Sequence, residues 1–242
     1  MIGCRCAVCR SEDPRNRRKR CSLYIREGGT HLVIDTPPDF REQVLAYGVE
    51  RVDALFFTHA HADHIFGLDD LRRFCALQKS YIPAYGSPET IRQIRSKFDY
   101  VDRRSHSFGG VPRIRFREMR EPVGCGNFRI IPLEVRHGRE AAYGYRIDAA
   151  SGGSVAYIPD CNEIPDAAMT QLAGVSVMIL DGLRPERHPT HFSIPEAVEH
   201  LGCVAPERAF VTHLAHNSEH TALERELAPR VEVPWDGLEI EV

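Results

Sequence analysis

The sequence lacks a basic excess, a long apolar run and the apolar core of a signal peptide. The chain has 242 residues and a formal net charge of -3 with neutral histidines. No global positive field is therefore present to hold long nucleic acid, and any such binding would have to be local. No apolar segment approaches the roughly 20 residues that would span a bilayer. Because the opening MIGCRCAVCR has no apolar core, we expect a cytoplasmic protein without a membrane partner.

Internal repeats and low-complexity segments are absent as well, and so is any inserted Gly/Pro-rich or Lys-rich arm. The hydrophobic share of 43% and the charged share of 27% are ordinary for a soluble globular protein. This length suits one domain of the larger kind, and we expect a single domain over residues 1–242. In the cytoplasm the eight cysteines are expected as thiols or metal ligands rather than as disulfides.

Strand and helix patterns alternate at both ends of the chain, and short strands follow one another in the middle. β-Branched and aromatic runs predict strands, while Ser87 with Pro88 and the capping box from Ser193 to Glu196 predict helix starts. The arrangement predicts an α/β (α+β) protein with two mixed sheets covered by helices. We expect strands at 30–35, 52–59, 82–86, 175–181, 207–213 and in pieces of 111–158, helices at 38–48, 67–78, 87–98 and 193–202, a solvated turn at 15–20, a last helix and a hairpin-like tail at 231–242.

Four ligand-type side chains crowd into one short loop, THAHADHIFG at 58–67. His59 and His61 lie at i and i+2, so on an extended backbone they share a face and can bind one metal ion. Asp63 and His64 follow at once and can serve a second ion. The loop follows the strand pattern FFTH, and α/β proteins usually build sites at the C-terminal ends of strands. Imidazole together with carboxylate suits Zn, Mn or Fe.

Three more ligand-type residues end apolar runs further along the chain: His137, Asp160 and His213. Each stands alone, but all three fall at the C-terminal end of a predicted strand. A carboxylate can bridge two ions, whereas an imidazole does not. Two ions about 3.5–4 Å apart polarise a phosphoryl oxygen and hold a hydroxide between them. The expected sets are His59, His61 and His137 on one ion, Asp63, His64 and His213 on the other, and Asp160 between them.

The motif THAHADH resembles the signature of the metallo-β-lactamase fold hydrolases. His137, Asp160 and His213 match the remaining ligands of that superfamily in order, and the resemblance covers nearly the whole chain. It implies a four-layer αββα sandwich with a dinuclear site at one edge. The superfamily includes β-lactamases, thioesterases, nucleases and phosphodiesterases, so the fold alone does not fix the substrate.

The N-terminal GCRCAVC places Cys4, Cys6 and Cys9 at C-x-C-x-x-C spacing. This spacing is a good three-ligand zinc clamp, and a structural site needs a fourth ligand to close it. We therefore expect a structural zinc whose binding loop lies within residues 1–21. The candidates for the fourth ligand are His216 in THLAH, which is preferred, and Cys21 and His220 as alternatives.

The cysteine clamp joined to a THxxH ending is similar to the phosphoribosyl cyclic phosphate phosphodiesterase family of the carbon–phosphorus lyase pathway. The resemblance implies that His216 completes the zinc site. It also implies a histidine ahead of a helix that acts on the phosphate as an acid or charge stabiliser. His191 in PTHFSIPEA fits that place, and His188 is the competitor. Together with Asp63 of the metal loop, His191 is the expected catalytic residue.

One departure from that family concerns the start of the chain. Relatives carry a first strand and a Gly/Ser-rich loop before the cysteine cluster, whereas this chain begins at MIGC. Either the start lies further upstream or one sheet lacks its first strand. In the second case we expect the stability of that sheet and the shape of the pocket to differ from those of the relatives.

The resemblance favours a metal-dependent phosphodiesterase that hydrolyses a small cyclic phosphodiester, such as a phosphoribosyl cyclic phosphate. An RNA-processing nuclease of the tRNA 3′-endonuclease type shares the ligand set, but the acidic balance and the lack of a long arm argue against it. An accessory member linked to quinone-cofactor biosynthesis is a third candidate, and the complete set of seven ligands argues against it. We expect two Mn or Zn ions in the catalytic site, one structural Zn and a small phosphodiester as partner, with a homodimer left open.

Overall fold

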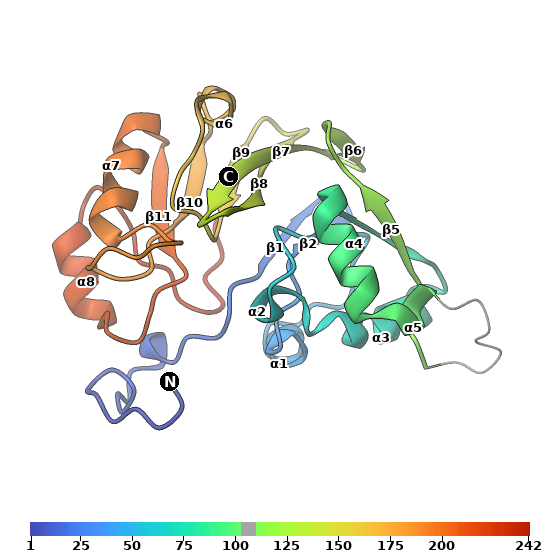
Figure 1. Ribbon diagram of the computed structural model, residues 1–242, viewed down its shortest axis with the longest axis horizontal. Helices are drawn as coiled ribbons and strands as arrows, with labels where there is room; N and C mark the ends of the chain where they lie inside the picture. The colour runs from blue at the N-terminus through green and yellow to red at the C-terminus, as the bar shows by residue number, and fades with distance from the viewer. Residues whose placement is uncertain (103–109) are drawn as a thin grey trace. The chain divides into compact units, whose positions relative to one another are not determined.

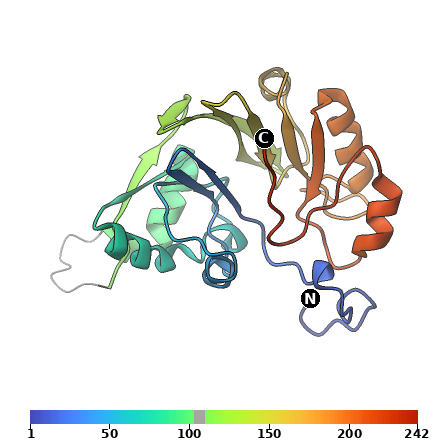
Figure 2. The ribbon, with the colours of Figure 1, turned by 180° about the vertical axis from the view of Figure 1, so that it is seen from behind.

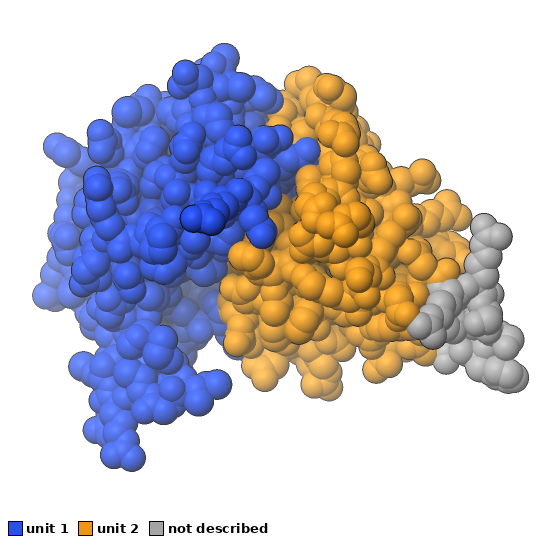
Figure 3. Space-filling model, in the orientation of Figure 1, with its two compact units in different colours: residues 1–19, 133–242 blue, residues 20–132 orange. Residues whose placement is uncertain are grey.

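A computed structural model describes residues 1–102 and 110–242. The chain divides into two compact units, which Figure 3 shows in different colours. Unit 1 consists of Met1–Lys19 and Leu133–Val242, and unit 2 consists of Arg20–Pro132. Each unit has its own hydrophobic cluster and its own share of the ligand-type side chains.

Unit 2 is built on a five-stranded sheet with the strand order β1-β2-β3-β4-β5. β1 and β2 are antiparallel and the other neighbours are parallel, so the sheet is mixed. Paired residues form one buried apolar row from Val33 through Leu55 and Ala84 to Phe116. The strands are β1 (Leu23–Glu27), β2 (Thr30–Ile34), β3 (Ala54–Phe56), β4 (Ile82–Gly86) and β5 (Ile114–Glu118).

The helices of unit 2 contribute to the same hydrophobic cluster as that row. α4 (Pro88–Lys97) lies against β4 and β5 (Figure 1) and buries Ile91 and Ile94. The hydroxyl of Ser87 accepts the N–H of Thr90, which confirms the start predicted from the Ser-Pro pair. The other helices are α1 (Phe40–Ala46), α2 (Ala62–Ile65), the 3₁₀ turn η2 (Leu68–Asp70), α3 (Leu71–Gln78) and α5 (Asp99–Asp102).

The second sheet is also mixed, with the strand order β11-β10-β9-β8-β7-β6. β9, β10 and β11 are parallel, and β8 runs antiparallel to β9. β10 lies between β9 and β11 and is buried at every residue. Its Met178 pairs with Ala156 on one side and Ala209 on the other. Unit 1 contains β8 (Glu140–Ala149), β9 (Ser154–Ile158), β10 (Val177–Asp181) and β11 (Arg208–Thr212), while β6 (Val123–Cys125) belongs to unit 2 and β7 (Phe128–His137) passes from unit 2 into unit 1.

Helices cover this sheet within unit 1. α7 (Ile194–Val204) packs against β10 and β11, as Figures 1 and 2 show. It begins with the predicted capping box, in which Ser193 Oγ accepts the N–H of Glu196 and the Glu196 carboxylate accepts the N–H of Ser193. The remaining elements are α6 (Asp166–Gln171), α8 (His220–Leu227) and the 3₁₀ turn η1 (Pro14–Asn16).

Two predictions for the last 50 residues were wrong: the end of the helix that starts after Ser193, and the hairpin-like tail. α7 does not stop at Gly202 but continues to Val204, and Ala205 takes the left-handed backbone with a φ of 51°. Residues 231–242, all of which the structure describes, contain no strand and form no hairpin. A single bridge instead pairs Glu232 with Phe210 of β11.

The predicted solvated turn at residues 15–20 was wrong in part. Arg17 and Arg20 are exposed, but Asn16 is buried and Arg18 is half-buried. Asn16 donates to the carboxylate of Glu219, so part of this basic stretch is packed into unit 1. Among the described residues, no helix is long and apolar enough to cross a membrane.

Candidate metal centres

In unit 2, His59 and His61 lie in the loop between β3 and α2. β3 ends at Phe56 and not at His59, where the predicted strand ended, so both histidines lie in the loop. Nε2 of His59 and Nδ1 of His61 are 2.9 Å apart. Ring nitrogens at this distance can share one proton or one metal ion. The structure therefore brings together the pair that the i, i+2 spacing indicated.

Asp35 lies behind this loop. It follows β2 with a left-handed φ of 62° and is fully buried. Its carboxylate accepts hydrogen bonds from the N–H and the hydroxyl of Thr58, at 2.9 and 2.7 Å, and lies 2.7 Å from Nδ1 of His64. Burial raises the pKa of the Asp35 carboxyl, and the charge of the His64 imidazole is the largest opposing influence. The contact orients His64 with Nε2 away from Asp35.

The same network sets the tautomers of His59 and His64. Because the Thr58 hydroxyl donates to Asp35, its oxygen lone pair is available to accept a proton from Nδ1 of His59 at 3.0 Å. Nδ1 of His64 donates to Asp35 in the same way. Both rings therefore carry a proton on Nδ1 and a lone pair on Nε2, the form in which imidazole binds a metal. Such partners behind ligand histidines are usual in metal sites.

Asp63 lies on the first turn of α2 with a half-exposed side chain. Its Oδ2 is 3.8 Å from Nε2 of His64, which is too long for a hydrogen bond. Two ligands that are each about 2.1 Å from one ion, at the tetrahedral angle, lie about 3.4 Å apart. The separation of Asp63 and His64 is close to that of two ligands of one ion.

In unit 1, three imidazoles surround the carboxylate of Asp160. His137 ends β7, Asp160 follows β9 and His213 follows β11. Nε2 of His213 lies 3.5 Å from Oδ1 of Asp160, and Nε2 of His137 and Nε2 of His191 each lie 4.0 Å from Oδ2. These separations also exceed hydrogen-bond length and suit ligands gathered around an ion.

Asp181, the last residue of β10, lies behind His191. Its Oδ2 is 2.7 Å from Nδ1 of His191 and accepts the N–H of Cys161 at 2.9 Å. Burial raises the pKa of the Asp181 carboxyl well above its usual range. The contact holds the imidazole in one orientation, and the ionised form of Asp181 stabilises the protonated ring, in which Nε2 can donate a proton.

His188, the competitor of His191, lies in the same loop. The two ring centroids are 5.2 Å apart, so the structure brings both histidines to this cluster. Nδ1 of His188 faces the N–H and the hydroxyl of Thr190, whereas Nδ1 of His191 faces a buried carboxylate. Burial lowers the pKa of His188, which disfavours its protonated form. The carbonyl of Thr190 also accepts the Nδ1 proton of His137 at 2.8 Å, which directs the lone pair of that ring to Nε2.

The sequence analysis missed Asp35 and Asp181 as parts of these clusters. Each is an aspartate at the end of an apolar strand pattern: Asp35 ends HLVID and Asp181 ends VMILD. The same signal indicated Asp160 after SVAYIPD. A general search for acidic residues at strand ends would therefore have found all three.

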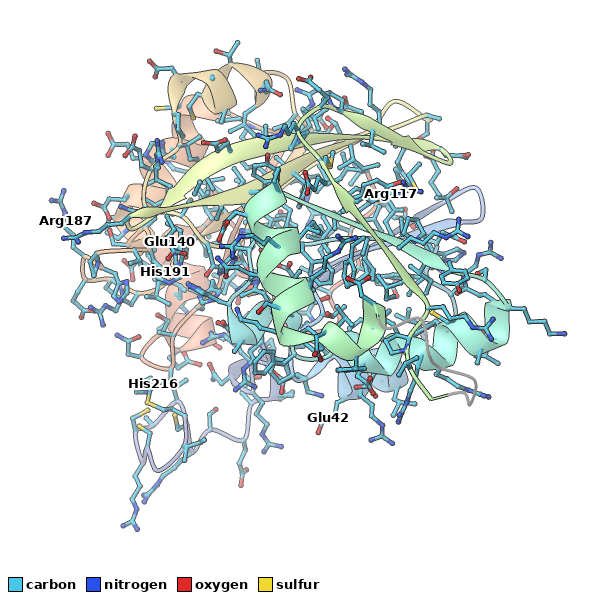
Figure 4. The ribbon with its side chains drawn as sticks, turned by 45° about the vertical axis from the view of Figure 1, so that its right-hand side comes forward. Glu42, Arg117, Glu140, Arg187, His191 and His216 are labelled. Atoms are coloured by element: carbon cyan, nitrogen blue, oxygen red, sulfur yellow. The ribbon has the colours of Figure 1, made fainter. Side chains whose placement is uncertain are left out.

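The N-terminal loop of unit 1 gathers the predicted zinc ligands. Figure 4 shows its sulfur atoms beside the labelled His216. Sγ of Cys4 and Sγ of Cys6 each lie 3.5 Å from Nδ1 of His216. With Cys9, the four ligand atoms lie within 4.8 Å of one another. Around a zinc ion with Zn–S of about 2.3 Å and Zn–N of about 2.1 Å, tetrahedral sulfur and nitrogen ligands lie about 3.6 Å apart. The four side chains fit such an ion.

Backbone N–H groups also point at the sulfur atoms. The N–H of Cys6 donates to Sγ of Cys4 at 3.5 Å, and the N–H of Cys9 donates to Sγ of Cys6 at 3.4 Å. The second contact is the largest of the influences that lower the pKa of Cys6 to about 6, and it favours the thiolate that a metal requires. The group of four ligand atoms within 4.8 Å of one another contains His216 and neither of the alternative fourth ligands, Cys21 and His220.

A family model described as the β-lactamase superfamily domain matches residues 30–214. The matched segment contains the seven candidate ligands of the His/Asp clusters and His191. It begins after the three cysteines and ends before His216, so the thiolate loop lies outside the part that the model describes.

Several curated relatives match most of this chain. An octanoyltransferase of Porphyromonas gingivalis is 33% identical over 246 residues, which cover 98% of this chain and 48% of that protein. The coenzyme PQQ synthesis protein B of Methylobacterium radiotolerans is 27% identical over 213 residues, which cover 74% of this chain and 67% of that protein. This chain thus spans about half the length of the first relative.

A crystal structure of a diphosphatase from the PhnP family is similar to this chain throughout its length. The two are 36% identical with a TM-score of 0.90, and the similarity covers 100% of this chain and 91% of the other. This likeness confirms the predicted fold class, in which helices flank two mixed sheets.

Proposed function

The chain belongs to the β-lactamase superfamily, whose members are metal-dependent hydrolases, and on that premise we propose that it hydrolyses a small cyclic phosphodiester. A phosphoribosyl cyclic phosphate is an example of this class. The observation that carries the proposal is the cluster around Asp160, where His191 stands among metal-ligand side chains with a buried carboxylate on its Nδ1. The likeness to a diphosphatase supports chemistry at phosphorus.

We assign the ligands as two sets of three with a shared carboxylate, following the order of the superfamily motif. The fit within each unit supports this assignment, because the Nδ1 protons of His59, His64 and His137 all have acceptors and leave Nε2 to bind. When bound, two divalent ions would polarise the phosphoryl oxygens and lower the pKa of water at the site. The sets are His59, His61 and His137, then Asp63, His64 and His213, with Asp160 shared.

His191 protonates the oxygen that leaves phosphorus. Asp181 holds it by Nδ1, so that Nε2 faces the reacting group and the imidazolium form is stabilised. An alkoxide leaving group needs such a proton far more than an aryloxide does. Asp160 contributes charge rather than a proton, because a carboxylate among three imidazoles balances two dications where an amide would not.

We assign the thiolate loop a structural zinc bound by Cys4, Cys6, Cys9 and His216. Thiolate and imidazole in this ratio are typical of closed zinc sites that hold no substrate. The loop lies among residues 1–21, without regular structure beyond the short turn η1. An ion there would supply the cross-links that a strand or helix supplies elsewhere.

A diphosphate is the second candidate substrate, since the solved relative of 36% identity is a diphosphatase. Both reactions break a P–O bond at a phosphorus that carries two bridging oxygens. They differ in the leaving group, which is an alkoxide in one case and a phosphate in the other. A phosphate leaving group is already stable as an anion, so only the cyclic ester depends strongly on His191.

The test is a comparison of substrates on the metal-loaded protein. A ribose cyclic phosphate, bis(p-nitrophenyl) phosphate, a dinucleoside diphosphate and a tRNA precursor would be compared by kcat/KM. We expect the cyclic ester to exceed the tRNA precursor by at least about 10²-fold. Turnover of the tRNA precursor alone would replace the proposal with a nuclease. No turnover of any of the four would contradict it.

A further inference from the structure

In unit 2, Phe66 carries an exposed aromatic ring near the end of the THAHADHIFG loop. It follows α2 directly, and its N–H donates to the carbonyl of Ala62 at 3.2 Å, so the helical spacing extends to it. Phe66 is 53% exposed, whereas His64 and Ile65 before it are buried. Residues three and four apart share one face of a helix. Phe66 therefore lies on the outer face of α2 together with Asp63, a candidate metal ligand.

Phe98 supports this ring from one side. The two ring centroids are 6.0 Å apart, and the rings are nearly perpendicular, at 86°. Phe98 itself is buried and packs edge-on against Tyr100, whose hydroxyl donates to Oδ1 of Asp69 at 2.9 Å. Edge-to-face packing of this kind is a preferred arrangement of aromatic pairs. The ring of Phe66 is thus held by the protein on one side and open to solvent on another.

The backbone on both sides of Phe66 is fixed by Thr36. The N–H of Thr36 donates to the carbonyl of His64, and the N–H of Gly67 donates to the carbonyl of Thr36, each at 2.8 Å. A side chain at position 67 has no room, because its Cβ would lie 2.3 Å from the carbonyl oxygen of Pro37. A ring that is fixed before a ligand arrives loses little conformational entropy on binding.

The C-terminal end of α4 contacts the same loop at a second point. Nζ of Lys97 donates to the carbonyl of Ala60, which stands between the two histidines of the HxH pair. This end of the helix therefore brings both the aromatic support of Phe66 and a positive charge to the loop that carries the candidate metal ligands. Such surroundings match a ligand that combines an anionic group with a flat apolar group.

We propose that Phe66 determines substrate specificity by stacking its ring on a planar group of the substrate, such as a nucleobase. Stacking of this kind needs only an accessible ring, since every base has a π face. The Cβ atoms of residues three apart on a helix are about 5–6 Å apart, so a phosphorus bound beside Asp63 places a base on the attached ribose near the ring. The inference rests on the proposed function and adds the organic part of the substrate: an ester that carries a base is preferred to one without.

The kinetic test compares two esters that differ only in the planar group. One is a ribose cyclic phosphate that carries adenine, and the other has a methyl group in place of the adenine. On the metal-loaded wild type we expect kcat/KM to be at least about fivefold higher for the adenine ester. Phe66→Leu keeps an apolar side chain without a π face, and it should raise KM for that ester at least about fivefold with little change in kcat. The methyl ester should lose less, and Phe66→Trp should keep the preference for adenine.

Tyr81→Leu is the matched control. Tyr81 is also 53% exposed, and its ring lies under the guanidinium of Arg115. It directly precedes β4, whereas the metal loop follows β3, and the two strands are parallel. Tyr81 therefore lies at the opposite edge of the sheet, and we expect its substitution to change neither ester. A loss of equal size on both esters in Phe66→Leu, or no loss on either, would overturn the proposal.

A binding measurement separates this inference from the proposed function. Adenosine monophosphate and ribose phosphate would each be titrated into the metal-loaded wild type and into Phe66→Leu by calorimetry. We expect the wild type to bind adenosine monophosphate at least about fivefold more tightly than ribose phosphate, and Phe66→Leu to lose most of this difference. If this holds while neither ester is hydrolysed, the proposed function fails and the stacking role of Phe66 stands. Equal binding of the two phosphates by the wild type would overturn the stacking role.

Discussion

The two ligand clusters of unit 1 rest on different supports. His137, Asp160 and His213 stand at the C-terminal ends of three strands of one sheet. Cys4 and Cys6 lie in a loop whose sulfur atoms are contacted by backbone N–H groups and by His216. The first cluster is therefore positioned before a metal arrives, whereas the second has little besides a metal to hold it.

This difference supports the proposed division into a catalytic centre around Asp160 and a structural centre in the cysteine loop. A catalytic centre needs ligands that are fixed by the fold and buried carboxylates behind them, as Asp181 is behind His191. A structural centre needs a complete set of ligands and nothing more. Substitutions in the two clusters should therefore impair the protein in different ways.

Asp160→Asn should have the largest effect. We expect turnover of a cyclic phosphodiester to fall by about 10³-fold or more, because an amide supplies no charge between two cations. Catalytic-metal content, measured by elemental analysis, should fall as well, while the zinc of the cysteine loop stays. Full turnover with all ions retained would remove Asp160 from the shared position.

His191→Ala should have the second largest effect on activity and should leave the metals in place. We expect kcat on an alkyl cyclic phosphate to fall by about 10²–10⁴-fold, and less on a p-nitrophenyl ester, whose leaving group needs little protonation. His188→Ala is the matched control from the same loop and should be nearly silent. If His191→Ala loses metal, it is a ligand; if both esters slow equally, it binds phosphate without acting as the acid.

Asp181→Asn and Asp35→Asn form a pair that compares the two buried carboxylates. We expect each to cost about 10–100-fold in activity, but for different reasons. Asp181→Asn should lower kcat and shift the pH profile of the general acid to lower pH, because the imidazolium of His191 loses its counter-charge. Asp35→Asn should lower the affinity for metal, because the Asp35 carboxylate orients His64. If the two variants have the same pH profile and the same metal affinity, the two carboxylates do not have these different roles.

The pH dependence of the cysteine loop should give the smallest effect. In the metal-free protein the pKa of Cys6 is lowered to about 6, so its thiolate form is favoured in the folded loop. The resulting stabilisation is fully present above the ordinary thiol pKa of about 8.5 and is lost as the pH falls through about 6. Alkylation of Cys6 by iodoacetamide, followed by mass spectrometry, should rise with an apparent pKa near 6. A rise only above pH 8 would contradict it.

The sequence predicted those elements whose pattern reflects burial. β4 was predicted at 82–86 and lies there, and α4 begins after Ser87 as expected. β1 and α6 were missed, because β1 is only partly buried and α6 is a single short helix with one buried residue. The low helix propensity of glycine predicted that α7 ends at Gly202. The helix continues to Val204, which packs against the hydrophobic cluster of unit 1.

The candidate ligands could be predicted because a metal demands particular side chains at strand ends. Asp35 and Asp181 share this strand-end signal, but the contacts that they make could not be predicted. Asp35 contacts Thr58 and His64, which are 23 and 29 residues away along the chain. Asp181 contacts His191, which is ten residues further along the chain. Nothing in the local pattern fixes such pairings, since they depend on which strands lie side by side.

The comparison between the clusters is tested most directly by counting metal ions. Protein purified without chelator would be measured by elemental analysis, beside a Cys4→Ser, Cys6→Ser double variant, with turnover of a ribose cyclic phosphate recorded for both. We predict three ions per chain in the wild type and two in the variant, with kcat per folded molecule retained in the variant. A variant that keeps all of its zinc, or that loses turnover while it keeps two ions, would contradict the division into a structural and a catalytic centre.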